Sequence, residues 1–387
     1  MKKQNMILLL VSLFSSILVS AAQEDVLADG FLKEQYQDIV INNVVVKPGV
    51  RECAHRYEAL KTILDRYQRP ITVLDIGASQ GYFSFKIAYE YDATCVMVEG
   101  DYNNDWRTTE QLLQLCKLNT ELDNIVFLRH RITPAELERL ATCEHFDVIL
   151  AFNILHHVGS DWQRAADALF KMGDNIIIET PPSDDVFADK HPTIRPIEKY
   201  LFDQQGTVIC ETPRHTDPNV TGKMFWFERV KTQMQRRHWF EKKLYEPGYS
   251  KLVITSTNTE KTVVKTETNA TYAWNQGINL LTFKMLGGAY PEPEMIERAV
   301  RNAYTGLHLD FFPWNMILQG ENIATIDNDD GRWIFDPQAS LDFSVQMLQN
   351  KTPQDVLSWY LAHWIPFAQS QGVYAHLLWC IDTAKVM

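Results

Sequence analysis

The sequence predicts an α/β protein with a mostly parallel sheet, followed by a smaller α+β region. Short apolar segments alternate with longer amphipathic segments between residues 71 and 178. This alternation is typical of a parallel sheet with helices on both faces. The alternation stops after residue 179, at Pro181 and Pro182, and the composition changes again near residue 231. These two changes separate the predicted sheet from the region that follows it.

The elements of the predicted sheet follow from hydrophobic periodicity. The five expected parallel strands span residues 71–76, 94–98, 125–128, 146–152 and 175–178. The four expected helices between them span residues 81–90, 106–119, 134–142 and 161–172. A further helix over residues 50–67 is expected to pack on the sheet before its first strand. After a helix at 197–204, strands at 206–211 and 224–229 are expected to close the sheet as an antiparallel hairpin.

The second region mixes short strands with helices. Residues 231–243 are rich in basic and aromatic side chains and are expected to form a helix that bridges two domains. Alternating apolar and polar residues predict two hairpins. Their strands span residues 251–255 and 261–267 in the first hairpin, and 317–318 and 323–326 in the second. Further helices are expected at residues 295–304, 340–348 and 355–364.

The N-terminus has the pattern of an export signal. Lys2 and Lys3 precede an apolar stretch over residues 6–19, and small residues follow at Ser20 and Ala21. The stretch is short for a membrane span, so a cleaved signal peptide over residues 1–22 is expected, with an uncleaved anchor as the alternative. The expected division continues with a leader at 23–49, one domain at 50–231 and a second at 232–387.

Charge and cysteine content narrow the functional classes. The formal net charge of −12 over 387 residues gives no strong signal for nucleic-acid binding, which requires a basic surface. An exported chain is compatible with disulfides. The six cysteines show no Cys-x-x-Cys spacing, however, so buried free thiols with at most one bridge are expected and a zinc site is not. No membrane contact is predicted after signal cleavage, and the oligomeric state is open.

The chain is organised around the glycine turn, which we define as residues 75–81. It reads Asp-Ile-Gly-Ala-Ser-Gln-Gly and joins the first predicted strand to the helix after it. Gly77 and Gly81 allow the backbone to approach a ligand closely, and the start of the helix offers free N–H donors. The spacing differs from Gly-x-Gly-x-x-Gly and from a phosphate loop. It indicates a nucleotide- or nucleoside-binding turn.

Polar residues end the neighbouring strands. Glu99 closes the second strand and is placed to accept hydrogen bonds from a ribose diol, as in Rossmann-like folds. The fourth strand ends at Asn153, and His156 and His157 follow within the same segment. Carboxyl ends of parallel strands meet at one edge of a sheet, so these residues are expected to lie near the glycine turn.

Together these segments resemble class I S-adenosylmethionine-dependent methyltransferases over about residues 50–230. The glycine turn resembles their first motif, Glu99 matches their acidic ribose-binding position, and residues 146–158 resemble their fourth-strand motif. The resemblance implies a Rossmann-like, seven-stranded methyltransferase sheet that binds S-adenosyl-L-methionine and a small-molecule methyl acceptor. The residues implied to bind the cofactor are Asp75, Gly77, Ala78, Gly81, Glu99 and Asn153. His130, Arg131 and Ile132 depart from the family's third-strand motif, so the adenine contact stays unassigned.

Catalytic residues are less sharply predicted. His156 and His157 are candidates for a general base, but they also suit simple packing against the next helix. Glu179, at the end of the fifth strand, is either a base or a helix cap. Methyl transfer to a soft nucleophile depends mainly on proximity and in-line orientation, so the prediction does not require a base.

A second group of polar residues lies in the C-terminal region. Asp310 is followed by Asn315 and then by Asp327 at the end of a short strand. The first carboxylate can accept a hydroxyl proton, while Asn315 and Asp327 can bind Mg²⁺. The segment resembles the core of kinase-like phosphotransferases, which implies Mg²⁺ with ATP, and Lys265 would pair with phosphate. The interval between Lys265 and Asp310 is shorter than in that family, and no glycine-rich loop precedes it. Turns and caps are the alternative.

Three functions therefore remain open. The first is an S-adenosylmethionine-dependent methyltransferase whose C-terminal domain shapes or recruits the acceptor. The second is a bifunctional protein with a kinase-like C-terminal lobe. The third is an exported, secreted or periplasmic, binding protein that keeps the fold without turnover.

Overall fold

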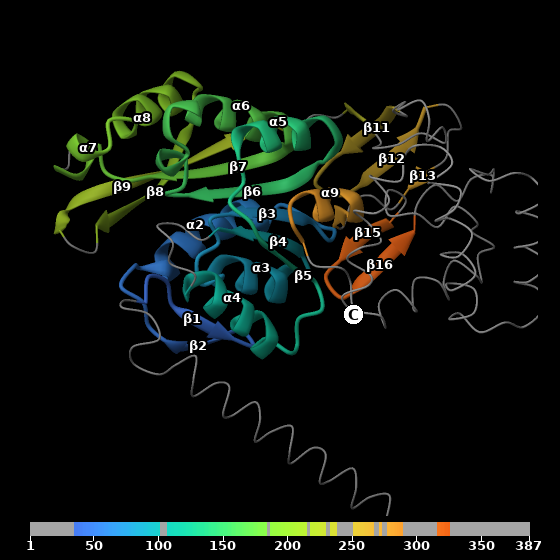
Figure 1. The fold of residues 1–387 in the computed structure, drawn as a ribbon, viewed down its shortest axis with the longest axis horizontal. Helices are drawn as coiled ribbons and strands as arrows, with labels where there is room; N and C mark the ends of the chain where they lie inside the picture. Colours follow the sequence, from blue (N-terminus) through green and yellow to red (C-terminus); the bar gives the residue numbers. More distant parts are fainter. Residues whose placement is uncertain are drawn as a thin grey trace, which may run out of the picture.

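The computed structural model describes residues 35–100, 107–183, 186–214, 217–229, 233–237, 251–266, 271–272, 277–288 and 316–325. A seven-stranded sheet with the strand order β5-β4-β3-β6-β7-β9-β8 forms its centre (Figure 1). The strands are β3 (Thr72–Ile76), β4 (Thr94–Glu99), β5 (Ile125–Arg129), β6 (Phe146–Phe152), β7 (Gly173–Thr180), β8 (Thr207–Arg214) and β9 (Asp217–Glu228). The first five pair in parallel, and β9 is antiparallel to β7 and β8. The predicted fold class is confirmed.

Helices cover both faces of this sheet. Figure 1 shows α5 (Pro134–Cys143), α6 (Trp162–Met172) and α8 (Ile194–Asp203) on one side. The other side carries α2 (Cys53–Leu64), α3 (Tyr82–Tyr91) and α4 (Arg107–Leu118). Every residue of β3, β4, β6 and β7 is buried. Such continuous apolar strands are expected where helices remove both faces of a parallel sheet from water.

The two faces are built by alternate residues of each strand. Leu74 and Ile76 pack with the side chains of α5 and α6. Val73 lies on the opposite face, among side chains of α2 and α3 such as Phe83. This two-residue period is a property of β-structure.

The helix boundaries have local causes. Thr133 caps α5 with a complete capping box. Its side-chain oxygen accepts from the N–H of Glu136, and the carboxylate of Glu136 accepts from the N–H of Thr133. Pro134 is the first residue of the helix. A short helix, α7 (Val186–Lys190), precedes α8. The predicted helix over residues 50–67 is the shorter α2.

The segment expected to be an exposed leader contains structure. Residues Ile39–Ile41 (β1) and Val44–Lys47 (β2) form an antiparallel hairpin. The side chains of Ile39 and Val40 are fully buried against the face that carries α2 and α3. The expectation was wrong here because a strand of three residues gives too little alternation to be seen in the sequence. The predicted signal peptide at 1–22 lies outside the described residues.

The C-terminal region contributes two further sheets. One has the order β10-β11-β12-β13, with β10 (Met234–Arg237), β11 (Lys251–Ser256), β12 (Lys261–Lys265) and β13 (Thr271–Tyr272). The other has the order β14-β15-β16, with β14 (Ile278–Asn279), β15 (Met316–Gln319) and β16 (Asn322–Thr325), and α9 (Leu280–Met285) follows β14. Both predicted hairpins are confirmed. The expected helices at 295–304, 340–348 and 355–364 lie outside the described residues.

The helix predicted over residues 231–243 is wrong at residues 234–237, which form β10. Met234 and Gln235 pair in antiparallel register with Ile254 and Val253 of β11. Nε of Arg236 donates to the carbonyl oxygen of Glu144 at 3.0 Å. Pairing with a distant strand therefore decides the conformation, and local composition carries no signal of that partner.

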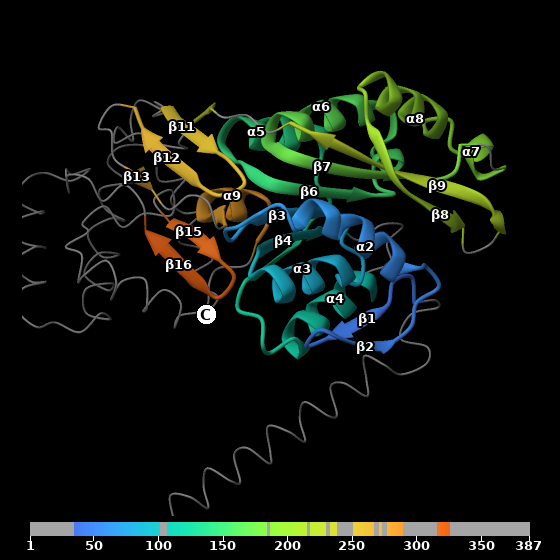
Figure 2. The same cartoon turned by 180° about the vertical axis from the view of Figure 1, so that it is seen from behind.

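The second C-terminal sheet extends the apolar core of the first domain. Phe283, Met316 and Leu318 belong to the same buried cluster as the side chains of α5 and α6. The turn of the β15–β16 hairpin packs on the loop before β5, where the N–H of Glu321 donates to the carbonyl oxygen of Asp123 at 2.7 Å. The reverse view shows this hairpin beside α9, which also contacts β15 (Figure 2).

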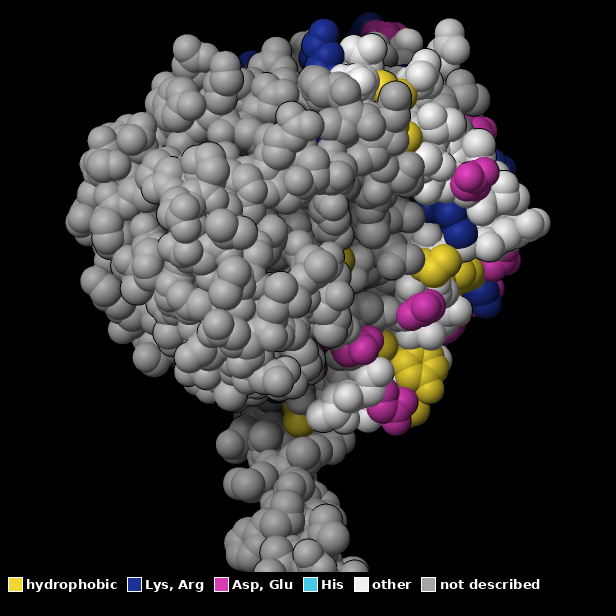
Figure 3. Space-filling model, turned by 90° about the vertical axis from the view of Figure 1, so that its right-hand side faces the viewer, with side chains coloured by type: hydrophobic (Ala, Val, Ile, Leu, Met, Phe, Trp, Pro, Cys, Tyr) yellow, Lys and Arg dark blue, Asp and Glu magenta, His cyan; other side chains and the backbone are white. Residues whose placement is uncertain are grey.

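On the face drawn in Figure 3, the described side chains are a mixture of acidic, basic and apolar groups. Within the described ranges, no helix is both long and apolar enough to cross a membrane. The five cysteines placed by the structure are free thiols: Cys53, Cys95, Cys116, Cys143 and Cys210.

Candidate cofactor and acceptor site

The glycine turn connects β3 to α3 in a conformation that only glycine adopts easily. Gly77 and Gly81 have φ angles of 77° and 75°. A Cβ added at Gly77 would lie 3.1 Å from Cδ1 of Ile154, and one at Gly81 would lie 2.7 Å from Cε2 of Phe85. The turn is therefore tightly packed on the protein side at both glycines.

Glu99 lies against this turn. Its Oε2 accepts a hydrogen bond from the N–H of Ser79 at 2.7 Å, and its Oε1 accepts one from the N–H of Gly100 at 3.1 Å. β4 pairs in parallel with β3, and this pairing carries the end of one strand to the end of the other. The structure thus brings Glu99 and the glycine turn together. A carboxylate can accept further hydrogen bonds on the same two oxygens.

Asp75 lies beneath the turn and is buried. Its Oδ2 accepts a hydrogen bond from the hydroxyl of Ser84 on α3 at 2.7 Å. Burial raises the pKa of the Asp75 carboxyl to about 6, and the Ser84 hydroxyl opposes this rise. The carboxylate therefore ties the strand to the helix and supports the turn from below.

An N-terminal residue that the sequence analysis missed completes the turn. The side-chain oxygen of Gln37 accepts from the N–H of Tyr82 at 3.1 Å, which satisfies a free donor at the start of α3. The N–H of Gln37 donates to Oε1 of Gln80 at 3.0 Å. No motif surrounds Gln37 in the sequence, so only the fold of the segment before β1 reveals this contact.

The end of β6 faces the same region. Asn153 adopts a φ of 53°, and its N–H donates to the carbonyl oxygen of Glu179 at 2.9 Å. The next residue, Ile154, packs on Gly77. This contact places the segment after β6 directly beside the glycine turn, which confirms that the two motifs share one edge of the sheet.

A group of three histidines follows Asn153. His156 and His157 lie on the short helix η2 (Leu155–Asp161), with ring centroids 4.0 Å apart. The ring of His191, which the sequence analysis did not single out, lies 5.7 Å from that of His156. Burial, and then the two neighbouring imidazoles of His157 and His191, lower the pKa of His156 to about 3. The pKa of the exposed His157 is also lowered, by partial desolvation and then by His191 and Arg131.

Glu179 has different surroundings from those of a base or a helix cap. Its carboxylate accepts from Nη2 of Arg51 at 2.5 Å, from Nη1 of Arg56 at 2.8 Å and from the hydroxyl of Thr212 at 3.0 Å. Burial raises the pKa of Glu179, but the two guanidinium groups outweigh it and hold the pKa below its usual value. The carboxylate is thus ionised, buried and held by two cations.

Comparison with known families identifies the domain that contains this site. A model of a methyltransferase domain matches residues 51–245. The chain belongs to this family of methyltransferase domains. Its fold is that of S-adenosylmethionine-dependent methyltransferases.

Three solved structures illustrate the similarity of the methyltransferase to other chains. The bifunctional kinase-methyltransferase WbdD is 16% identical, with 85% of this chain and 87% of that chain covered and a TM-score of 0.42. The N-terminal domain of EvdMO1 with SAH bound is 12% identical, with coverages of 55% and 96% and a TM-score of 0.36. A putative O-methyltransferase from Klebsiella pneumoniae is 15% identical, with coverages of 46% and 81% and a TM-score of 0.35. The search of curated proteins gave no match.

For the second group of predicted site residues, the structure describes the neighbouring strands but not the three residues themselves. Asp310, Asn315 and Asp327 lie outside the described residues of the methyltransferase. The β15–β16 hairpin between the last two is present, and its register pairs Met316 with Thr325. Lys265 is buried on β12, opposite Leu252 of β11.

Proposed function

We propose that the chain binds S-adenosylmethionine at the shared edge of β3, β4 and β6 and transfers its methyl group to a small-molecule acceptor. The observation that carries this proposal is the meeting of Glu99 with the glycine turn, through the 2.7 Å bond from the N–H of Ser79. A carboxylate beside a glycine turn suits this cofactor. The carboxylate would accept hydrogen bonds from the ribose hydroxyls, and the methionine part would lie along the backbone of the turn.

The binding roles follow from the positions of the side chains. Gly77, Ala78 and Gly81 would offer backbone to the methionine part of the cofactor, and Glu99 would accept the ribose hydroxyls. Asn153 would face the amino-acid end of the cofactor or the acceptor. Asp75 would act from beneath, since its carboxylate bonds to Ser84.

The bound cofactor would supply an electrophilic methyl group on a sulfonium sulfur. A lone pair of the acceptor forms the new bond to carbon while the sulfur–carbon bond breaks, and the sulfonium becomes a neutral thioether. The protein mainly holds the acceptor in line with that bond. The acceptor's proton leaves to a base or to water.

His157 is the better candidate for such a base. It is exposed, and its lowered pKa keeps the imidazole neutral and able to accept a proton at neutral pH. His156, with a pKa of about 3, is too weak a base and would orient the acceptor or His157 instead. Glu179 would be a positioning residue, because two arginines occupy its carboxylate.

Calorimetric titration with S-adenosylmethionine tests the proposal. We expect binding by the unaltered chain and a loss of at least about ten-fold in affinity for Glu99→Gln, which loses its charge but keeps its shape. Glu110→Gln, at a half-buried position on α4, is the control and should bind as the unaltered chain does. No binding at millimolar cofactor would retire the proposal.

A second candidate function is magnesium-dependent phosphate transfer by the C-terminal domain. What supports it is the order of Asp310, Asn315 and Asp327 in the sequence, with the β15–β16 hairpin between the last two. In this proposal Asp310 would accept the hydroxyl proton, and Asn315 and Asp327 would bind Mg²⁺. Magnesium-dependent ATP binding that Asp327→Ala abolishes would support it, and the absence of ATP binding would retire it.

The third candidate, an exported binding protein without turnover, depends on the N-terminus. Mass spectrometry of the mature chain would distinguish cleavage after residue 22 from an uncleaved anchor. Cofactor binding without methylation of any acceptor offered would favour this reading.

A further inference from the structure

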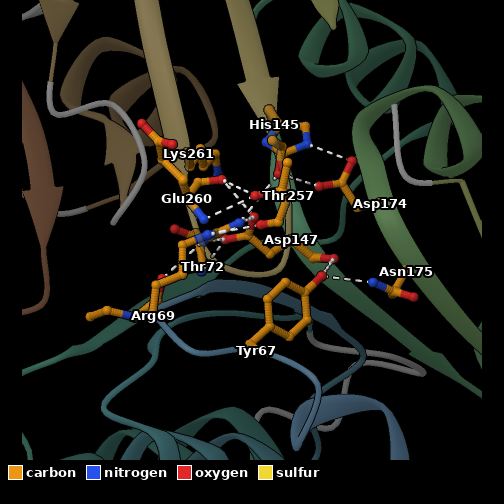
Figure 4. Close-up of polar contacts among 12 residues, drawn as sticks. Tyr67, Arg69, Thr72, His145, Asp147, Asp174, Asn175, Thr257, Glu260 and Lys261 are labelled. Atoms are coloured by element: carbon orange, nitrogen blue, oxygen red, sulfur yellow. Dashed lines mark hydrogen bonds and ion pairs between the residues drawn. The ribbon is translucent and has the colours of Figure 1, made fainter. Parts of the chain in front are cut away.

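A second polar cluster lies at the opposite edge of the central sheet, where β6 and β7 begin (Figure 4). It consists of His145, Asp147 and Asp174, all buried, whose potential ligand atoms lie within 4.8 Å of one another. One imidazole and two carboxylates have the chemistry of a divalent metal site. The sequence analysis did not single out these residues, and the proposed methyl transfer does not use them.

Two cations already occupy the surroundings of Asp147. Nη2 and Nη1 of Arg69 donate to its two oxygens at 2.7 and 3.1 Å. Nζ of Lys261 lies 3.3 Å from Oδ1, and the N–H of Thr72 donates to Oδ2 at 2.9 Å. Both oxygens of Asp147 therefore already accept two hydrogen bonds each, which leaves little capacity for a metal ion.

Asp174 is bound in a similar way. Its Oδ2 accepts from the hydroxyl of Ser256 at 2.7 Å, and its Oδ1 lies 3.1 Å from Nε2 of His145. Burial, and then the ammonium of Lys261, lower the pKa of His145, which keeps the imidazole neutral. The two carboxylates are thus balanced by the charges of Arg69 and Lys261. A divalent ion would add charge to a balanced site and would be repelled by both cations.

The groups that complete this cluster come from the C-terminal region. Lys261 opens β12 and Ser256 closes β11, so the β11–β12 hairpin supplies both. The connection between them adds backbone contacts to the sheet domain. Nε of Arg69 donates to the carbonyl oxygen of Thr257 at 3.1 Å, and the N–H of Gln68 donates to that of Asn258 at 2.9 Å. The β11–β12 hairpin therefore supplies Lys261, one of the two cations that neutralise Asp147.

We propose that Lys261 is a tethered cation that takes the place of a metal ion between His145, Asp147 and Asp174, and that it locks the β11–β12 hairpin onto the methyltransferase sheet. The lock would act on β6 and β7. These strands begin at this cluster and lead to Asn153, directly after β6, and to Glu179, near the end of β7, on the edge that carries the candidate site. The C-terminal region would thus fix the base of the two strands that carry the candidate acceptor residue Asn153 and the positioning residue Glu179.

Hydrogen exchange of the full chain tests the lock. We expect Lys261→Met to speed the exchange of the β11 and β12 amides by at least about ten-fold, because Asp147 loses a buried partner. Lys251→Met, which removes an exposed lysine from the same hairpin, is the control and should exchange as the unaltered chain does. Unchanged exchange in Lys261→Met would overturn the proposal. If Lys261→Met does not fold, Lys261→Arg decides: a folded and protected chain supports a role of charge, and an unfolded one overturns it.

Metal analysis provides a second, independent arm. The purified full chain should lose no thermal stability after dialysis against a chelator, and added Zn²⁺ or Mn²⁺ should produce no binding that His145→Gln removes. Chelator sensitivity that Zn²⁺ or Mn²⁺ restores would overturn the proposal, since the cluster would then hold a metal ion in addition to Lys261.

Discussion

Nη1 of Arg56 donates to Oε2 of Glu179 at 2.8 Å, and both side chains are almost fully buried. Arg51 bonds to the other oxygen of the same carboxylate, so two guanidinium groups share one buried negative charge. The three side chains join α2 and the segment before it to β7, the last of the parallel strands described. These buried ion pairs between distant segments are therefore expected to affect the free energy of unfolding.

Glu179→Gln should lower the free energy of unfolding by about 3–5 kcal/mol, because it leaves two buried arginines without a countercharge. Glu211→Gln, at an exposed position on β8 of the same sheet, should change it by less than about 0.5 kcal/mol. Urea denaturation of the two variants measures the difference. The pKa of Glu179 is lower in the folded than in the unfolded chain, so this contribution is present above the unfolded pKa and lost as the pH falls through the folded one. Equal stability of both variants would contradict the prediction.

Asp75→Asn should stabilise the cofactor-free chain at pH 7. The folded pKa of Asp75, about 6, exceeds its ordinary value of 3.8, so stability falls as the pH rises between these values. An asparagine can still accept from Ser84 and avoids burying the charge, which corresponds to about 3 kcal/mol at pH 7. Thermal unfolding at pH 4 and pH 7 measures the effect, with the exposed Asp92→Asn as the control. A pH dependence that Asp75→Asn leaves unchanged would show that Asp75 does not titrate in this range.

Gly77→Ala should reduce both stability and affinity for S-adenosylmethionine. The residue has a φ of 77°, and the added methyl group would crowd Ile154 at 3.1 Å, so we expect a loss of about 1–3 kcal/mol in stability. Gly159→Ala separates the effect of backbone strain from that of crowding by a neighbouring side chain. Gly159 has a similar φ of 78°, but the space around its Cβ position is open. It should lose about 1–3 kcal/mol from the backbone alone, because its φ of 78° and ψ of −142° suit only glycine, and it should keep its cofactor affinity. Comparable loss of affinity in both variants would argue against a specific role for the glycine turn.

His156 and His157 should have different pKa values, and both values should depend on His191. His156 should stay neutral above pH 5, given its pKa of about 3, while His157 should titrate below the ordinary value of 6.5. His191→Gln should raise the pKa of both, because the charge of His191 opposes protonation of its two neighbours. NMR of ¹³C-labelled histidine, assigned with single His→Gln variants, measures all three. Values unaffected by His191→Gln would show that the three rings are not coupled.

The sequence predicts the central sheet well because its signals are local. Each parallel strand is a short apolar run, and the glycine turn has a recognisable spacing, so Gly77, Glu99 and Asn153 could be placed at one edge before the structure was known. Their roles as cofactor ligands remain predictions. The β11–β12 and β15–β16 hairpins were also predictable from alternation, within one or two residues at each end.

Other parts of the site depend on contacts that no local pattern encodes. Gln37 meets the glycine turn across 43 residues, and Lys261 meets Asp147 across 114 residues. Each looks like an ordinary polar residue in its own segment. The position of Glu179 at a strand end predicts either a base or a helix cap. No local pattern encodes its partners, Arg56 on α2 and Arg51 before that helix.

One contact has a kinetic consequence. Ile154 packs on Gly77 and is the residue after Asn153, so the segment that would receive the acceptor touches the turn that would receive the cofactor. Neither can shift without displacing the other, because both are closely packed. Filling one half of the site should therefore alter the rate at which the other half fills or empties. Such an enzyme would take up its two substrates in a preferred order, and the acceptor would influence how long the spent cofactor stays bound.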